Sequence, residues 1–400
     1  MRRAAVLSVF VMAACGTTSS PLAGAHRSSP AASVPAASPS ATRFSPASTT
    51  SPSQRPSAIA VPSSSPSPIS LPPVSPAPVA PAGQCYLPVA LSRGYQGPLT
   101  GAFFEYPAGV LTPSVTIMNA PSPGFTWSSP PTYDRVVSRW LPAPPDALSP
   151  DGLSFAYAEY DVPAAGTAGD LTNTGRVHLV DAASGVDRIL FNGSPTYAVV
   201  GFTRDGIYLA QVAVTPDGEF RSGLFLLKPA GGTPKPVAGG TRTLDRSGWE
   251  VAGGAAWGTD YSSGGGIQPG NQLVRLDLKS GAVQPWLTRP EGNGVGFVGF
   301  DLQGDPIAVV FWSGYSSTGS PAPPQPTEVL ILSTPDVGKV VYQSSDPSAS
   351  FPRGPAYADS HGVWLSGNAG SVLLNTPQSG LRSVPVPSNG AAVSVAGTCQ

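Results

Sequence analysis

From residue 83 onward, apolar residues occur in short runs rich in β-branched and aromatic side chains, and glycine-containing turns separate the runs. Runs of about four to eight such residues between turn signals are typical of β-strands. The sequence has no long apolar stripe with a 3.6-residue period and capping residues, which would indicate an amphipathic helix. The pattern predicts an all-β fold.

The runs form a repeating unit with two halves. The first half is an apolar strand, an Asp–Gly-type turn and a second apolar strand. Tight hairpin turns need positive φ, which Gly and Asp tolerate best. The second half is a strand, a Ser–Gly-type turn and another strand. The first half occurs at 148–157, 202–209, 300–310 and 357–365, and the second at 177–190, 224–232, 273–281, 329–338 and 371–380.

Four strands per unit, at a period of about 50 residues, predict a single β-propeller of four-stranded antiparallel blades over residues 83–400. A degenerate copy around Gly253-Gly254 and a first copy around 107–109 bring the expected number of blades to six. The number would be seven if the two terminal strands formed a small blade of their own.

The stretch Leu-Ser-Pro-Asp-Gly at 148–152 resembles the repeat of TolB-like, WD40-like propellers. In that family this turn joins the two innermost strands of a blade. The resemblance covers most of residues 95–386, and it implies a fold rather than a function.

The N-terminus has the pattern of an export signal. Two arginines precede an apolar stretch at 4–14, which has the length of a signal peptide and is too short to span a bilayer. The sequence Met-Ala-Ala-Cys-Gly at 12–16 resembles a bacterial lipoprotein lipobox, which implies a signal peptide at 1–14 and acylation of Cys15. We therefore expect a lipid anchor on the outer face of the cytoplasmic membrane, within a bacterial cell envelope. The alternative is ordinary secretion, with cleavage after the Ala-Gly-Ala site at 23–25.

Residues 15–82 are expected to be a disordered linker. About three-quarters of residues 16–82 are Pro, Ser, Ala or Thr, and Asp, Glu and Lys are absent. Such a composition cannot bury enough apolar surface to offset the conformational entropy that folding removes. The linker would act as a tether that holds the propeller away from the membrane.

Cys85 and Cys399 stand at the two ends of the predicted propeller. Propellers commonly join their first and last blades by pairing strands from both termini, and 86–91 and 391–396 are both strand-like. An exported protein lies in an oxidising compartment, where cysteines pair. We expect a Cys85–Cys399 disulfide that fastens the ring.

The charge balance bears on the class of partner. After residue 82 the chain has 17 basic and 23 acidic residues, and all seven tryptophans lie there. A nucleic-acid surface needs clustered Lys and Arg to neutralise phosphates, so we expect no nucleic-acid partner. We expect a monomer.

Three long loops join the two halves of a unit, at 161–175, 258–271 and 313–327. In a propeller these loops emerge on one face, and long insertions on one face of a repeat array mark a binding surface. Tyr and Trp suit such a surface because they offer large contact area at low entropic cost. The alternative is that the tryptophans pack at strand ends and the loops have no binding role. The candidate binding-face residues are Tyr160, Asp161, Trp257, Tyr261, Trp312 and Tyr315.

Groups for catalysis or metal binding are sparse. His178 alternates with apolar residues on a strand and is expected to face solvent, and His361 lies in a hairpin turn and is expected to be exposed. Zinc sites need several His, Cys or Asp in ligand spacing. With both folded-domain cysteines paired, we expect no metal, no cofactor and no assignable catalytic residue. Carboxylate pairs can lie far apart in sequence, which leaves open Asp134, Glu159, Asp161 and Asp260.

These features favour a membrane-anchored extracytoplasmic binding protein that presents its propeller to an envelope protein, a glycan or a small ligand. The alternative is an extracytoplasmic propeller hydrolase or lyase with its site at the central channel. Inward-facing carboxylates or histidines at the channel would favour the enzyme, and a broad aromatic-rimmed face would favour the binder. A structural spacer is a third possibility.

Overall fold

The computed structural model of the chain contains almost only strands. It describes residues 69–81, 83–93, 99–118, 131–159, 175–215, 218–242, 244–245, 248–262, 270–314, 321, 323–346, 354–367 and 370–400. The one helix in these ranges is the short 3₁₀ turn η1 (Pro145–Ala147), so none is long or apolar enough to cross a bilayer.

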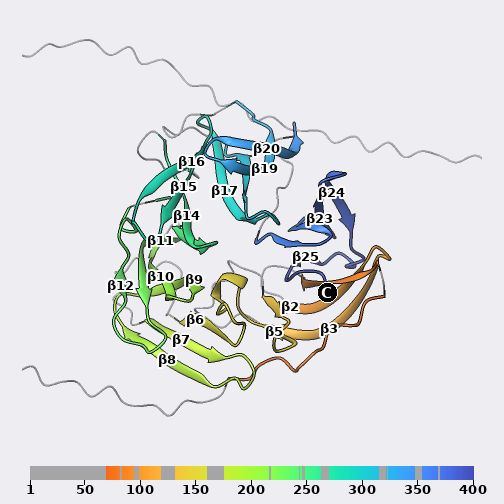
Figure 1. The fold of residues 1–400 in the computed structure, drawn as a ribbon, viewed down its shortest axis with the longest axis horizontal. Coiled ribbons are helices and arrows are strands. Elements are labelled where there is room, and N and C mark those ends of the chain that lie inside the picture. Colours follow the sequence, from red (N-terminus) through yellow and green to blue (C-terminus); the bar gives the residue numbers. More distant parts are fainter. Residues whose placement is uncertain are drawn as a thin grey trace, which may run out of the picture. The chain divides into compact units, whose positions relative to one another are not determined.

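The strands form a ring of six blades, and every paired strand within a blade is antiparallel (Figure 1). From the axis outward, blade 1 contains β25 (Ala392–Val395), β1 (Cys85–Ser92), β2 (Leu99–Tyr106) and β3 (Val110–Met118). Blade 3 contains β9 (Tyr197–Thr203), β10 (Gly206–Thr215), β11 (Gly218–Leu227) and β12 (Lys235–Pro236). Blade 4 contains β13 (Trp249–Ala252), β14 (Ala255–Asp260), β15 (Gln272–Asp277) and β16 (Val283–Thr288). Blade 5 contains β17 (Asn293–Phe300), β18 (Pro306–Trp312), β19 (Thr327–Thr334) and β20 (Val337–Ser344). Blade 6 contains β21 (Tyr357–Asp359), β22 (Gly362–Ser366), β23 (Ser371–Thr376) and β24 (Gly380–Pro385).

Blade 2 departs from this regularity. Its sheet has three strands, β6 (Ser154–Glu159), β7 (Gly175–Asp181) and β8 (Asp187–Gly193). The inner position is held by a single bridge between Leu148 and Phe155, directly after η1. The all-β propeller of six blades is therefore confirmed, with one blade reduced at its inner edge.

A small hairpin of β4 (Thr132–Asp134) and β5 (Arg139–Leu141) lies between blades 1 and 2 (Figure 1). Its Trp140 is fully buried and packs against Phe103 of β2 and Tyr133 of β4. The Trp140 ring lies so close to Gly101 that a Cβ at that position would overlap it. The glycine in β2 thus permits the hairpin to close the gap between the two blades.

The two halves of the repeat correspond to the two hairpins of each blade. In blade 2 the Ser149 hydroxyl donates to Asp151 Oδ1 (2.6 Å) and accepts from the Ser154 amide (2.9 Å), while Gly152 has φ 71°. In the outer hairpins of blades 2 and 4, an aspartate accepts from a serine amide three residues later, as between Asp181 and Ser184 (2.7 Å). The turn residues in the sequence therefore locate the hairpins correctly.

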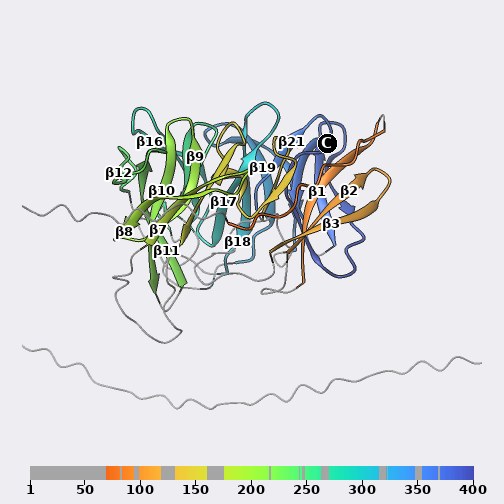
Figure 2. The same cartoon turned by 90° about the horizontal axis from the view of Figure 1, so that it is seen from below.

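Antiparallel order divides the ring into two faces, which Figure 2 shows edge-on. One face carries the turns that join the first to the second strand and the third to the fourth strand of each blade, and we call it the turn face. The loop face carries the connections from second to third strand and from blade to blade.

The ring is closed within blade 1. Strand β25, near the C-terminus, pairs with β1 from Val89↔Val395 to Ser92↔Ala392. The Tyr86 and Gln400 backbones exchange two hydrogen bonds of 3.1 Å. A disulfide joins Cys85 and Cys399, whose Cα atoms are 5.4 Å apart. Because the terminal strands belong to one sheet with β2 and β3, they form no seventh blade.

The chain already contacts the ring before residue 83. The Ile69 amide donates to the Gly185 carbonyl (2.8 Å), and the Ser75 amide to the Ser138 carbonyl (2.9 Å). The Tyr133 hydroxyl donates to the Ser75 carbonyl at 2.9 Å. Residues 69–81, which the composition places in the linker, therefore lie against blade 2 and the β4–β5 hairpin.

Replacing both Cys85 and Cys399 with serine is expected to lower the free energy of unfolding by roughly 2–4 kcal/mol, because the cross-link restricts a very long loop of the unfolded chain. The measurement is urea unfolding of the oxidised protein and the double variant. Reductant should lower the midpoint of the parent protein and leave that of the double variant unchanged. Equal midpoints for the two oxidised proteins would contradict a stabilising role of the Cys85–Cys399 disulfide.

Candidate functional site

The predicted binding face lies only partly within the described residues. The strand ends that bracket the three long loops all lie on the loop face, as the repeat predicted. Tyr160, Asp161 and Tyr315 fall outside the described residues, so their placement on that face stays a prediction.

Trp257 is not a surface residue. It is 3% exposed, stacks on Phe297 with ring centroids 5.1 Å apart, and meets Trp286 edge-on. Its strand β14 is buried along its whole length, because both sides of this second strand face neighbouring blades. The prediction that Trp257 belongs to the binding face is wrong, and the alternative of strand packing holds for it.

Tyr261 and Trp312 are half-buried at the loop-face ends of β14 and β18. The Trp312 indole Nε1 has no hydrogen-bond partner among the described residues. These two side chains are compatible with a binding rim, but the described residues alone do not complete one.

A polar cluster lies instead around the axis of the ring. Glu250 lies on β13 and Tyr357 on β21, which are the innermost strands of blades 4 and 6. Asp146 lies in η1, which contacts the inner strands β9 and β13. Thr132 of β4 and Arg221 of β11 complete the group, which we call the axial cluster. Its members interact electrostatically although they come from five separate elements.

Burial governs the protonation of the two carboxyl groups. It raises the pKa of Asp146 to about 6, and the Arg221 guanidinium lowers it in part. It raises the pKa of Glu250 to about 8, with a further contribution from the Asp146 charge. Protein surrounds both groups closely, yet each retains some solvent access, as expected for side chains near the axis of a ring. At neutral pH, Asp146 is largely ionised and accepts hydrogen bonds, whereas Glu250 is largely protonated and donates one.

Two hydroxyl groups of the axial cluster, those of Thr132 and Tyr357, lie against each other. Thr132 is 4% exposed, and its Oγ1 lies beside the Tyr357 hydroxyl. The Thr132 hydroxyl lowers the pKa of Tyr357 in part, but neither oxygen forms a hydrogen bond of good geometry with the part of the chain that the structure describes. Burial also raises the pKa of Tyr357, so the phenol stays protonated and keeps its donor. A buried hydroxyl without a partner costs free energy, which a bound polar ligand would recover.

A second polar cluster lies on blade 2. His178 is 5% exposed, stacks on Tyr157 at 4.4 Å, and bonds Asp187 Oδ2 through Nδ1 at 2.9 Å. The prediction that His178 faces solvent is wrong, because the Tyr157 ring covers it and Asp187 satisfies it. Glu159 pairs with Arg176 at 2.8 Å. These contacts hold three strands together, and His178 Nε2 lies 3.5 Å from Glu159 Oε2 without a hydrogen-bond partner among the described residues.

The remaining carboxylates and the other histidine have structural partners. Asp134 accepts the Val136 amide at 2.7 Å in the β4–β5 turn, and Asp260 accepts Arg242 Nε at 2.7 Å. His361 is only partly exposed, and its Nδ1 lies 3.3 Å from Asp359 Oδ1. Asp134, Glu159 and Asp260 lie in separate elements with separate partners, and Asp161 lies outside the described residues.

The axial cluster was missed in the sequence because its members are far apart and on different repeats. The available signals were weak. Glu250 interrupts the apolar run 249–252, and Asp146 follows three prolines and an alanine. Only the closure of the ring brings these positions together.

Comparison with known proteins finds only distant structural similarity. No family model matches the chain, and no curated protein matches it. Among solved structures, TolB from Acinetobacter baumannii is 11% identical over 79% of this chain and 67% of that chain, with a TM-score of 0.42. An oligogalacturonate lyase from Vibrio parahaemolyticus is 12% identical over 76% and 92%, with a TM-score of 0.37. PQQ-bound aldose sugar dehydrogenase from Streptomyces coelicolor is 16% identical over 60% and 86%, with a TM-score of 0.33. The propeller fold itself rests on the strand order of this chain.

The raised pKa of Glu250 predicts a pH-dependent stability. Between its ordinary value of 4.5 and about 8, the native state holds a proton that the unfolded state releases, so rising pH lowers the free energy of unfolding. The glutamine of Glu250→Gln does not titrate, so the variant should not show this fall in the free energy of unfolding. The difference in free energy of unfolding between the variant and the parent should therefore grow as pH rises from 4.5 to about 8. Urea unfolding at several pH values measures it.

The control is Glu291→Gln, which alters an exposed glutamate on the β16–β17 turn. It should leave the pH dependence unchanged. Parallel pH profiles for the parent protein and Glu250→Gln would show that the Glu250 carboxyl is not buried in its protonated form.

Proposed function

We propose that the protein is a membrane-anchored extracytoplasmic binding protein whose axial cluster binds a small, hydroxyl-rich ligand such as the end of a glycan. The observation that carries the proposal is the pair of hydroxyls of Thr132 and Tyr357, which lack a hydrogen bond of good geometry and lie within electrostatic range of the part-buried Asp146. Asp146 in turn interacts with the part-buried Glu250. Convergent polar groups contributed by several elements are typical of small-molecule sites.

The chemistry of the cluster suits a neutral polyol. Ionised Asp146 accepts hydrogen bonds, protonated Glu250 donates one, and the two hydroxyls can do either. Sugar hydroxyls are also both donors and acceptors, so one sugar can satisfy several members of the cluster at once. Arg221 sets the electrostatic balance by lowering the pKa of both carboxyl groups.

The anchoring part of the proposal rests on the sequence. The lipobox-like pattern before Cys15 and the Pro/Ser/Ala-rich segment support a lipid-anchored stalk at the outer face of the cytoplasmic membrane. The contacts of residues 69–81 with the ring fix where the chain leaves the propeller, at blade 2 and the β4–β5 hairpin.

The test is calorimetric titration with a panel of neutral, acidic and amino mono- and disaccharides. We expect one class to bind with one site per chain. Tyr357→Phe and Thr132→Val should each weaken that binding by about tenfold, because each removes a buried hydroxyl whose hydrogen bond to the ligand is worth ~1.4 kcal/mol. Glu291→Gln serves as the matched control and should bind as the parent does.

Two results would overturn the axial site. One is the absence of binding across the whole panel. The other is binding that Tyr357→Phe and Thr132→Val leave unchanged, which would move the site to the loop face, where an envelope protein or a larger glycan would be held.

A second candidate function is hydrolysis or elimination at the same cluster. The observation that favours it is the pair of interacting carboxyl groups, Asp146 and Glu250, whose pKa values burial raises, because two such groups can share one proton and act as a base paired with an acid. In that case the bound saccharide would be consumed during titration, and Glu250→Gln would abolish turnover while retaining binding. Unchanged saccharide after prolonged incubation with the parent protein would exclude this candidate for the panel.

A further inference from the structure

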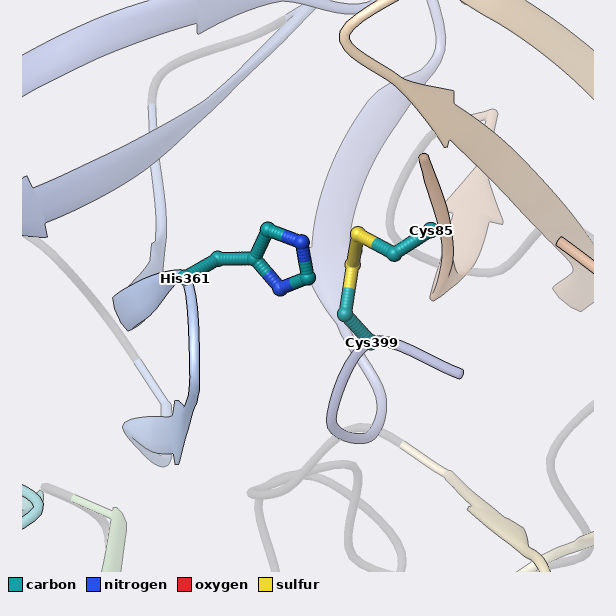
Figure 3. A group of neighbouring side chains, drawn as sticks. All are labelled: Cys85, His361 and Cys399. Carbon is teal, nitrogen blue, oxygen red and sulfur yellow. A yellow bond between two sulfur atoms is a disulfide. The ribbon is translucent and has the colours of Figure 1, made fainter. Parts of the chain in front are cut away.

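Three potential metal ligands meet on the turn face where the ring is closed. Cys85 begins β1, Cys399 follows β25, and His361 lies in the turn between β21 and β22. The ligand atoms of these three residues all lie within 4.8 Å of one another. Figure 3 shows the imidazole ring of His361 directed toward the disulfide. The three come from blades 1 and 6, so the group spans the junction of the ring.

Asp359 holds this group in place. Its Oδ1 accepts the His361 amide at 2.8 Å and lies 3.3 Å from His361 Nδ1, so Asp359 engages Nδ1 and not Nε2 of the ring. Its Oδ2 accepts the backbone amide of Cys399 (2.8 Å) and the Trp364 indole (2.9 Å). A carboxylate that fixes the tautomer and orientation of a histidine is the usual outer partner of a metal-ligating imidazole.

The geometry does not depend on the disulfide alone. Residues on both sides of it are paired, through the two Tyr86–Gln400 backbone bonds and the β1–β25 ladder. Both cysteines are buried, at 2% and 9% exposure. After the S–S bond is cut, the sulfur atoms therefore stay close, and they need to separate only to about 3.8 Å to share one zinc ion at ~2.3 Å from each.

We propose that the reduced form of this protein binds one Zn²⁺ through the thiolates of Cys85 and Cys399 and the Nε2 of His361, with the fourth position open to water. A dithiol supplies the two electrons and two protons that convert the disulfide into two thiols, and it becomes a disulfide itself. Zinc binding then displaces both thiol protons. Two thiolates and an imidazole form a ligand set that zinc favours. The junction of the ring is thus held covalently when oxidised and by the metal when reduced.

The test uses Co²⁺ as a spectroscopic substitute for Zn²⁺, on the full chain with Cys15→Ser so that only two thiols remain. After reduction and removal of the dithiol, Co²⁺ should give one site per chain with thiolate charge-transfer bands and the visible absorption of a tetrahedral ion. Zn²⁺ should displace it. The oxidised protein should show none of these bands.

The variant series separates a built site from two adventitious thiols. His361→Ala should weaken Co²⁺ binding by more than about 100-fold, and Asp359→Asn by about 10- to 100-fold. The matched control, His26→Ala, changes a histidine of the Pro/Ser-rich segment and should bind as the parent does. Circular dichroism of each reduced variant without metal establishes that it is folded.

Two results would overturn the proposal. The first is the absence of thiolate bands when the reduced, folded protein is titrated with Co²⁺. The second is equal affinity and an equal spectrum for His361→Ala, which would mean that two thiols bind the ion without the histidine. Neither result bears on the axial cluster, because the two groups share no residue.

Discussion

The propeller depends on the pairing of its two ends. Each blade packs on its two neighbours, so an open ring would leave two blade faces exposed to water. The pairing of β25 with β1 removes that exposure by placing both ends of the ring in one sheet. The core of blade 1 is accordingly assembled from distant segments: Leu87 and Phe104 pack with Trp364, Val393 and Val395. The placement of residues near the axis of the ring therefore depends on this closure.

The axial cluster follows from the same closure. Its residues come from β4, η1, β11, β13 and β21, and ring geometry alone brings them within electrostatic range. The departure of blade 2 from four strands matters here. Because a single bridge replaces an inner strand, η1 takes up the inner position and places Asp146 there. The least regular part of the ring thus supplies one of its two axial carboxylates.

Much of the fold could be predicted from the chain itself. Local turn chemistry, such as Asp151-Gly152 and Ser184-Gly185, locates hairpins because the required φ restricts the residue type. Two cysteines at the ends of the repeat array indicated how the ring closes. The burial of Trp257 and His178 could not be predicted in this way. An alternating strand has one face toward each neighbouring blade, so the polar–apolar pattern does not distinguish solvent from a covering Tyr157 ring.

The path of the chain between the linker and the ring has a mechanical consequence. Tension on the N-terminal segment reaches the propeller first at Ile69 and Ser75, whose hydrogen bonds to blade 2 and the β4–β5 hairpin carry the initial load. If these contacts yield, the load passes to Cys85 and crosses the disulfide to Cys399. Strand β1 lies between β25 and β2, so it cannot peel from the ring while that bond holds. Under tension, residues 69–81 would detach from the propeller while the ring stays closed.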